Sequence, residues 1–331
     1  MKRYLLVDAM NLFFRARHVA HKGSDINERV AMSLHIVMMS MSKAWRLHNA
    51  DHIVVCLDGR SWRKDVYAPY KKNREVDKAA LTDQDIIENE EYFAAFGELI
   101  EFLEDRTNIT VISCDIGEAD DLIARWIHYH PDDQHTIVSS DTDMVQLLAS
   151  NVDQYNGITQ ELITLSGITN DRGKPVIDKK TKLPKVVEDP QWQLFVKCMR
   201  GDPGDNVFSA FPQVRIKGSA KKVGLTEAYA DRAKKGYAWN NIMLQRWVDH
   251  NKVEHRVLDD YNRNVGLIDL TAQPAHIKEK LDGCIVDATA VVKNKQMVGA
   301  HFLKFCGRYD LVKLSENATV FGEILSAAYP E

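Results

Sequence analysis

The stretch LLVDAMNLFFRA, residues 5–16, sets the pattern of the first half of the chain, because an apolar run ends at Asp8 and passes into a helix-like pattern. Apolar runs recur at residues 52–57, 109–113 and 136–138, and helix-like patterns lie between them, the longest at 26–48. Strands that alternate with helices predict an α/β fold: a central, mostly parallel sheet flanked by helices and joined by right-handed crossovers.

The composition is that of an ordinary globular protein. Of the 331 residues, 45% are hydrophobic and 27% are charged, and the net charge is −4, which excludes a fibrous or wholly disordered chain. No stretch approaches the roughly twenty consecutive apolar residues of a membrane span, so we expect neither a membrane segment nor a secretory signal. The five cysteines are scattered and never in C-x-x-C spacing, which argues against disulfides and structural zinc and favours the cytoplasm.

The near-neutral net charge conceals a segregated charge pattern. Residues 60–78, 171–185 and 213–236 are locally basic, whereas residues 83–105 hold nine acidic residues and no basic one. A single charged run is usually a solvated face. Three basic runs that alternate with isolated carboxylates favour a surface that binds phosphate groups and also needs cations.

The chain is expected to form two domains. Residues 1–190 form the α/β core, which includes a protruding helical excursion at about 65–105, because this segment is too long and too polar for an ordinary crossover. Short β-like pieces within 151–190 predict hairpins. Residues 191–331 are interpreted as a smaller, mainly helical domain.

Carboxylates follow each predicted strand. Because the carboxyl ends of parallel strands share one edge of a sheet, where ligands bind, these residues are predicted to meet in one crevice. They are Asp8, Asp58, Glu118 with Asp120 and Asp121, and Asp141 with Asp143. Asp202 and Asp205, in the turn GDPGDN, are candidates to join them.

Crowded carboxylates need cations, since like charges raise one another's pKa. An all-oxygen ligand set without Cys or His selects Mg²⁺ or Mn²⁺, and two such ions suit a phosphodiester displacement. The alternative interpretation is that each acid only caps a helix or forms a turn. Capping alone explains poorly why acids follow four successive strands.

Five motifs in this order resemble the metal-dependent 5′-nucleases, the family of flap endonucleases, 5′→3′ exonucleases and the exonuclease domain of bacterial DNA polymerases. They are LLVDAMNLFFRA (5–16), CLDGRSWRKDVYAPYKKNR (56–74), GEADDLIA (117–124), SSDTDMVQL (139–147) and GDPGDN (201–206). The segment DDYNRNVGLIDL (259–270) resembles the ribonuclease H of T-even-type bacteriophages, a member of this family. For a phage protein, the cytoplasm would be that of the host.

The resemblance implies a role for each site residue. Asp8, Asp58, Glu118 and Asp120 would surround one Mg²⁺, for which Mn²⁺ can substitute; Asp141, Asp143 and Asp202 would complete a second; Asp121 and Asp205 would be outer ligands. Lys71 and Arg74 would stabilise charge at the scissile phosphate as the catalytic cations. Nucleic acid would be contacted by Arg63, Tyr70, Lys72, Arg215, Lys217, Lys221 and Lys222.

The excursion after Tyr70 is similar to the helical arch through which the family passes a 5′ single strand. In the family a glycine-rich hairpin, often with bound K⁺, grips the duplex after GDPGDN. Here the corresponding PQVRIKGSAKK (212–222) is poorer in glycine, which argues against K⁺. The basic residues of this region still favour contacts to the sugar-phosphate backbone without sequence readout.

The first hypothesis is therefore a two-metal 5′-nuclease that acts on DNA or RNA–DNA hybrids with a 5′ end or flap and removes RNA primers in replication. It would work as a monomer, with a single-strand-binding protein or a sliding clamp as candidate partners. The alternatives are a PIN-like single-strand ribonuclease, which is usually shorter and lacks the arch, and a non-catalytic, structure-specific DNA-binding protein.

Overall fold

The computed structural model describes residues 1–20, 25–219 and 222–330. The chain divides into two compact units. The first comprises Met1–Ser61, Leu81–Val187 and His276–Glu331, and the second comprises Trp62–Ala80 and Glu188–Ala275.

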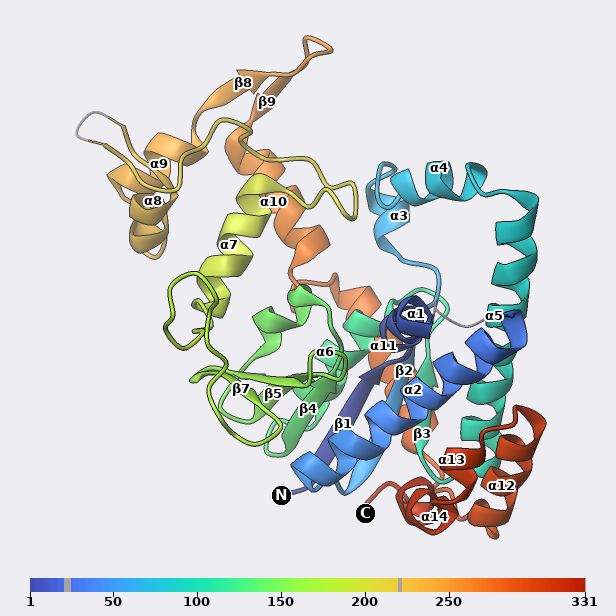
Figure 1. Ribbon diagram of the computed structural model, residues 1–331. Helices are drawn as coiled ribbons and strands as arrows, with labels where there is room; N and C mark the ends of the chain where they lie inside the picture. Colours follow the sequence, from blue (N-terminus) through green and yellow to red (C-terminus); the bar gives the residue numbers. More distant parts are fainter. Residues whose placement is uncertain (21–24, 220–221, 331) are drawn as a thin grey trace. The chain divides into compact units, whose positions relative to one another are not determined.

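A seven-stranded sheet forms the centre of the first unit (Figure 1). Its order is β3 (Thr110–Ser113), β2 (His52–Leu57), β1 (Arg3–Asp8), β4 (Gln134–Val138), β5 (Val152–Asn156), β6 (Glu161–Thr164) and β7 (Gly167–Asn170). The first five strands are parallel, and β6 and β7 continue the sheet as antiparallel hairpins. The predicted mostly parallel sheet and the hairpins after residue 151 are confirmed.

Helices cover both faces of this sheet. One face packs against α1 (Ala9–Ala20), α2 (Ile26–His48) and α5 (Asp83–Arg106), whose buried residues share a core with Leu5 and Val7 of β1. On the opposite face lies α6 (Ala119–Tyr129), where the ring of Trp126 meets that of Tyr4 at 5.3 Å. Successive side chains of β1 point to opposite faces of the sheet, so they pack into two different cores.

The last helices belong to the first unit, which differs from the predicted division at residue 190. These helices are α11 (Ala275–Thr289), α12 (Val298–Arg308), α13 (Val312–Ser315) and α14 (Ala318–Ser326). Phe302 and Phe305 of α12 pack on Phe102 of α5, with ring centroids 6.2 and 4.8 Å apart; Figure 1 shows α12 beside α5. The apolar faces of α12 and α14 are therefore buried in the sheet core rather than in a separate domain.

The excursion is helical, as predicted, but only in part solvated. It contains α3 (Arg63–Val66), α4 (Asn73–Ala79) and α5. The first turns of α5 are exposed, whereas from Tyr92 onward one face of the helix is buried in the core. The acidic run 83–105 is thus a packed helix with an acidic outer face.

The second unit is mainly helical. It contains α3 and α4 together with α7 (Pro190–Arg200), α8 (Leu225–Asp231), α9 (Tyr237–Met243), the hairpin β8 (Arg246–Val248) and β9 (Glu254–Arg256), and α10 (Val257–Ile268). Its core joins Phe195 and Met199 of α7 to Trp239 of α9 and Val257 of α10.

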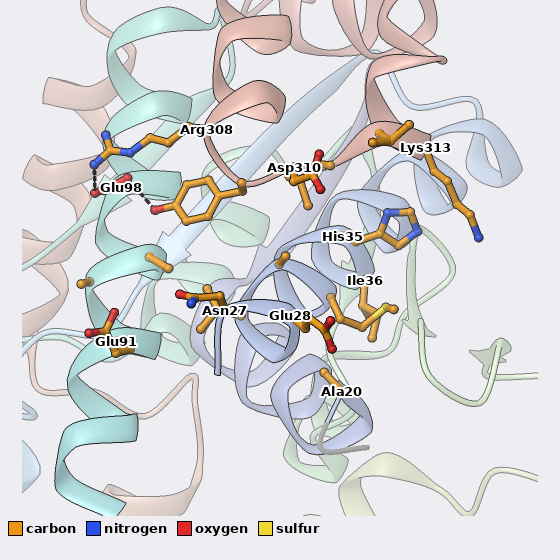
Figure 2. A pocket seen from close by; sticks show the side chains of 18 of the residues that line it. Ala20, Asn27, Glu28, His35, Ile36, Glu91, Glu98, Arg308, Asp310 and Lys313 are labelled. Carbon is orange, nitrogen blue, oxygen red and sulfur yellow. Dashed lines mark hydrogen bonds and ion pairs between the residues drawn. The ribbon is translucent and has the colours of Figure 1, made fainter. Parts of the chain in front are cut away.

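Two further features of the described residues complete the fold. None of their helices is both long and apolar enough to span a membrane. A pocket of about 1110 Å³ lies between α2, α5 and the segment that joins α12 to α13, and side chains such as His35, Glu91 and Lys313 line it (Figure 2). None of the predicted site residues lines this pocket.

Candidate metal centre and phosphate-binding cations

The carboxylates of the first unit follow neighbouring strands. Asp8 is the last residue of β1 and Asp58 comes directly after β2. Asp141 lies three residues past β4, and Glu118 caps α6 in the connection that leaves β3. Because β3, β2, β1 and β4 are adjacent and parallel, these side chains belong to one edge of the sheet.

Asp8 is the most deeply placed acid of this edge. Only 7% of the residue is exposed. Its Oδ2 accepts a hydrogen bond from Ser139 Oγ at 2.9 Å and its Oδ1 accepts one from the Asn11 N–H at 3.2 Å. Burial, followed by the charge of Asp58 and more weakly that of Asp141, raises the pKa of Asp8 to about 7. The hydrogen bonds oppose this shift without cancelling it.

Three carboxylates gather at the start of α6. Oxygen atoms of Glu118, Asp120 and Asp121 lie within 4.8 Å of one another. Asp121 accepts a hydrogen bond from the Glu118 N–H at 3.2 Å, and Ser61 Oγ donates to Glu118 Oε2 at 2.9 Å. The helix N-terminus and these donors hold the acids in place, and the group has the size and the oxygen donors for a cation.

The remaining acids of this edge are fixed by backbone hydrogen bonds. Asp58 Oδ1 accepts from the Ala119 N–H at 2.8 Å, which ties the end of β2 to the start of α6. Asp141 Oδ1 accepts from the Asp143 N–H at 2.9 Å and so orders the short 3₁₀ turn after β4. The buried amide of Gln154 donates to the Asp141 carbonyl at 2.6 Å. The loop that carries Asp141 and Asp143 is therefore anchored from the neighbouring strand.

Gly59 allows two acid-bearing loops to approach closely. A Cβ atom at this position would lie 1.9 Å from the Cys114 carbonyl oxygen. The Gly59 N–H donates to the Gly117 carbonyl at 2.8 Å. Glycine here keeps Asp58 beside the loop that leads to Glu118.

The second unit holds the other predicted acids. Asp202 Oδ2 lies 2.8 Å from Lys197 Nζ, and its Oδ1 accepts from the Gly204 N–H at 2.9 Å. Burial alone would raise the pKa of Asp202, but the lysine and the backbone donors together lower it. Asp205 accepts hydrogen bonds from Tyr70 Oη at 2.9 Å and Arg74 Nη2 at 2.7 Å. Whether Asp202 completes a metal site with Asp141 and Asp143 stays a prediction.

Two of the predicted nucleic-acid contacts are buried in the second unit, and their role in binding nucleic acid stays a prediction. The side chain of Arg63 is buried, and its Nε donates to the Leu267 carbonyl at 2.7 Å. The ring of Tyr70 is buried in a cluster with Cys198 and Val207. Both side chains are used to pack the second unit.

The other predicted contacts are open to solvent where the structure describes them. Lys72, Arg215, Lys217 and Lys222 are exposed, so their role in binding phosphate groups stays a prediction. Lys221 lies outside the described residues.

A family model described as "5'-3' exonuclease, N-terminal resolvase-like domain" matches residues 3–173, which is 171 of the 331 residues. The chain belongs to this family of 5′-nucleases. This 5′-3′ exonuclease family member is 28% identical over 269 residues to DNA polymerase I of Rhizobium leguminosarum, an alignment that covers 76% of the chain and 22% of the polymerase. It is also 28% identical over 172 residues to the flap endonuclease Xni of Shewanella loihica, over 50% of the chain and 59% of Xni. The chain therefore spans less than two thirds of either relative.

Solved structures share the fold. Bacteriophage T5 5′-exonuclease with bound zinc superposes with a TM-score of 0.58 at 20% identity, over 88% of this chain and 99% of the T5 chain. The T5 D15 flap endonuclease variant crystallised with DNA and metal ions has a TM-score of 0.54 at 19% identity, over 97% and 100%. At this identity the likeness establishes the fold, an α/β sheet with a helical second unit.

The donor set of this family member fits hard divalent cations. All seven predicted ligands of the first unit are carboxylates, and neither a Cys nor a His is among them. The raised pKa of Asp8 has the same implication, because it reports negative charges crowded in a buried place. A divalent cation would relieve this repulsion.

The residues that hold the acids in place could not be recognised from motifs. Asn11 Oδ1 accepts from both the N–H and the Oγ of Ser140, at 3.0 and 2.9 Å, and so joins α1 to the loop after β4. Gln154 follows Val152 on the same inward face of β5. The sequence of this strand, VDQYN, does not alternate apolar and polar residues, and both Gln154 and Tyr155 are buried, so local periodicity could not single out Gln154.

Proposed function

We propose that the chain is a structure-specific 5′-nuclease, a 5′→3′ exonuclease or flap endonuclease that hydrolyses phosphodiester bonds with divalent metal ions. The observation that carries this proposal is the gathering of carboxylates on one sheet edge, with Glu118, Asp120 and Asp121 within 4.8 Å of one another. Family membership supports the same chemistry.

The acids of the first unit have the role of metal ligands in this proposal. Asp8, Asp58, Glu118 and Asp120 would hold one ion, and Asp141 and Asp143 would contribute to a second, with Asp202 as a further predicted ligand. Two Mg²⁺ ions, when bound, supply activation of the attacking water and charge stabilisation at the leaving oxygen. Asp121 is buried, and its carboxylate accepts a hydrogen bond from the Glu118 N–H. It would thus hold Glu118 in place for the first ion.

The cations of the second unit bind the phosphate. Lys71 and Arg74 are five and eight residues past Val66, the end of α3, and both lie near the carboxylate of Asp205. Both stabilise negative charge on phosphoryl oxygens, Arg74 through its forked guanidinium and Lys71 as a point charge. The exposed Lys72, Arg215, Lys217 and Lys222 track the sugar-phosphate backbone of the duplex.

The proposed substrates are DNA and RNA–DNA hybrids with a free 5′ end or a 5′ flap, and RNA-primer removal is the proposed role in replication. The T5 relative was crystallised with DNA, which supports DNA as one substrate class. A single-strand-binding protein or a sliding clamp would deliver the enzyme to such ends.

The test is cleavage of a 5′-flapped duplex and of an RNA-primed duplex, first in EDTA and then with added Mg²⁺. We expect no product in EDTA and 5′-derived products in Mg²⁺. Binding without cleavage under every divalent ion would favour the non-catalytic DNA-binding alternative. Activity confined to single-stranded RNA would favour the PIN-like ribonuclease.

A further inference from the structure

The turn that carries Asp205 is joined to the segment that carries the two phosphate-binding cations. The Lys71 N–H donates to the Asp205 carbonyl at 2.9 Å, and Asn206 Nδ2 donates to the Pro69 carbonyl at 2.7 Å. Asn73 Nδ2 donates in the same direction as the Lys71 N–H, to the Gly204 carbonyl at 3.1 Å. These three bonds connect residues more than 130 positions apart and place the two segments in one fixed register.

The side chain of Asp205 completes this connection. Its Oδ1 accepts from Arg74 Nη2 at 2.7 Å, whereas its Oδ2 accepts from Tyr70 Oη at 2.9 Å and lies 3.7 Å from Lys71 Nζ. Both carboxylate oxygens thus face donors of the 70–74 segment. The ring of Tyr70 is buried in a cluster with Val207. The hydroxyl that donates to Asp205 therefore comes from a side chain that is fixed by packing.

Lys71 and Asp205 are mostly buried, whereas Arg74 is exposed. The side chains of Lys71 and Asp205 are 15% and 22% exposed, whereas that of Arg74 is 59% exposed. A long arginine at the surface would otherwise sample many rotamers, which costs about 2 kcal/mol to restrict. An ion pair with a half-buried, hydrogen-bonded carboxylate reduces this freedom before the substrate arrives.

Two cations face one carboxylate in this cluster. Lys71 and Arg74 both lie beside Asp205, and each can donate hydrogen bonds to a phosphate oxygen. Two cationic side chains already compensate the charge of Asp205, Arg74 at 2.7 Å and Lys71 at 3.7 Å, whereas both oxygens of Asp8 accept from neutral donors. A carboxylate compensated in this way attracts a divalent cation less strongly. The cluster therefore resembles a preorganised phosphate clamp more than a metal site.

We propose that Asp205 is a positioning residue that aims Lys71 and Arg74 at the scissile phosphate, and that it is not a metal ligand. This inference rests on the proposed nuclease function. It replaces the outer-ligand role that the sequence resemblance implies for Asp205.

The test compares Asp205→Asn with Asp143→Asn, a variant of a proposed metal ligand. In Asp205→Asn we expect kcat on a 5′-flapped duplex to fall about tenfold to hundredfold, with KM changing much less. The affinity for Mg²⁺, measured by titration calorimetry without substrate, should stay within about twofold of the wild type. Adding Asp205→Asn to a Lys71→Ala/Arg74→Ala double variant should cost little more, since Asp205 acts through these two cations.

Two further variants keep the test decisive. Asp259→Asn removes an exposed charge of the same unit and should leave kcat unchanged. Tyr70→Phe keeps the buried ring but loses the hydroxyl that supports Asp205; it should lower kcat by about threefold to tenfold. If Asp205→Asn does not fold, Tyr70→Phe carries the test, and an unchanged kcat in it would overturn the proposal.

Three results separate this proposal from the proposed function. A loss of Mg²⁺ binding in Asp205→Asn as large as in Asp143→Asn would make Asp205 a metal ligand and overturn the inference. A kcat equal to that of Asp259→Asn would also overturn it. If the wild type cleaves no 5′-ended substrate, the nuclease proposal fails. The NMR signal of ¹³C-methylated Lys71 then decides, because positioning requires this signal to move in Asp205→Asn and to stay in place in Asp259→Asn.

Discussion

Replacement of Asp8 by Asn should stabilise the metal-free protein. The carboxylate is buried at the end of β1 and lies in the negative field of Asp58 and Asp141. Asparagine has nearly the same shape and keeps both hydrogen bonds, since its carbonyl oxygen accepts from the Asn11 N–H and the Ser139 hydroxyl can accept from its amide. The substitution therefore removes a buried charge without opening a cavity.

The size of the effect follows from the pKa of Asp8, which rises from 3.8 to about 7 on folding. Between these two values the folded protein retains a proton that the unfolded chain has lost, so stability falls as the pH rises; above pH 7 the loss is complete. The full cost of the ionised side chain is at most about 4 kcal/mol. The advantage of Asp8→Asn should therefore grow by about 2 to 3 kcal/mol between pH 5 and pH 8.

The assay is urea unfolding of both proteins in EDTA across this pH range. Hydrogen exchange of the β1 amides identifies the transition of the first unit, because the chain has two units that can unfold separately. Asp132→Asn removes an exposed acid of the same unit and serves as the control, with an expected change within about 0.5 kcal/mol. Added Mg²⁺ should stabilise the wild type more than Asp8→Asn, since only the wild type keeps this proposed ligand.

Two results would refute the reasoning. If Asp8→Asn is less stable than the wild type in EDTA at pH 8, the ionised Asp8 carboxylate does not destabilise the folded, metal-free protein. If its advantage does not depend on pH, the effect comes from packing rather than from charge.

The remaining predictions concern the same unit. Asp143→Asn should abolish cleavage of a 5′-flapped duplex and leave DNA binding equal or tighter, because it removes a proposed metal ligand and a negative charge; near-normal turnover would contradict the site assignment. Gly59→Ala should destabilise the first unit by about 2 to 4 kcal/mol and weaken Mg²⁺ binding in calorimetry, since its Cβ would lie 1.9 Å from the Cys114 carbonyl; an unchanged melting temperature would show that the loop shifts without cost. Burial lowers the pKa of His52 from 6.5 to about 4, so the stability that depends on its neutral ring is present above pH 6.5 and lost as the pH falls toward 4. In urea unfolding, the free energy of unfolding of His52→Gln should fall less steeply than that of the wild type between pH 6.5 and pH 4. An identical fall in both proteins would exclude His52 as a cause of the acid destabilisation.

The sheet and its acidic edge could be predicted from the amino-acid sequence because both depend on local patterns. Apolar runs that alternate with helical periods specify parallel strands, and the residue after each run then lies at the shared edge whatever the rest of the chain does. Asp8, Asp58, Glu118 and Asp141 follow this rule.

The tertiary structure alone decided which partners bury a side chain. Periodicity shows that α12 has an apolar face, but not that Phe302 packs on α5 instead of in a separate domain. Arg63 and Tyr70 look like surface contacts in a basic stretch, yet Leu267 and Asp205 hold them from positions 204 and 135 residues away. Burial and ion pairing depend on which distant segments meet in space, and a local pattern of residue types carries no information about that meeting.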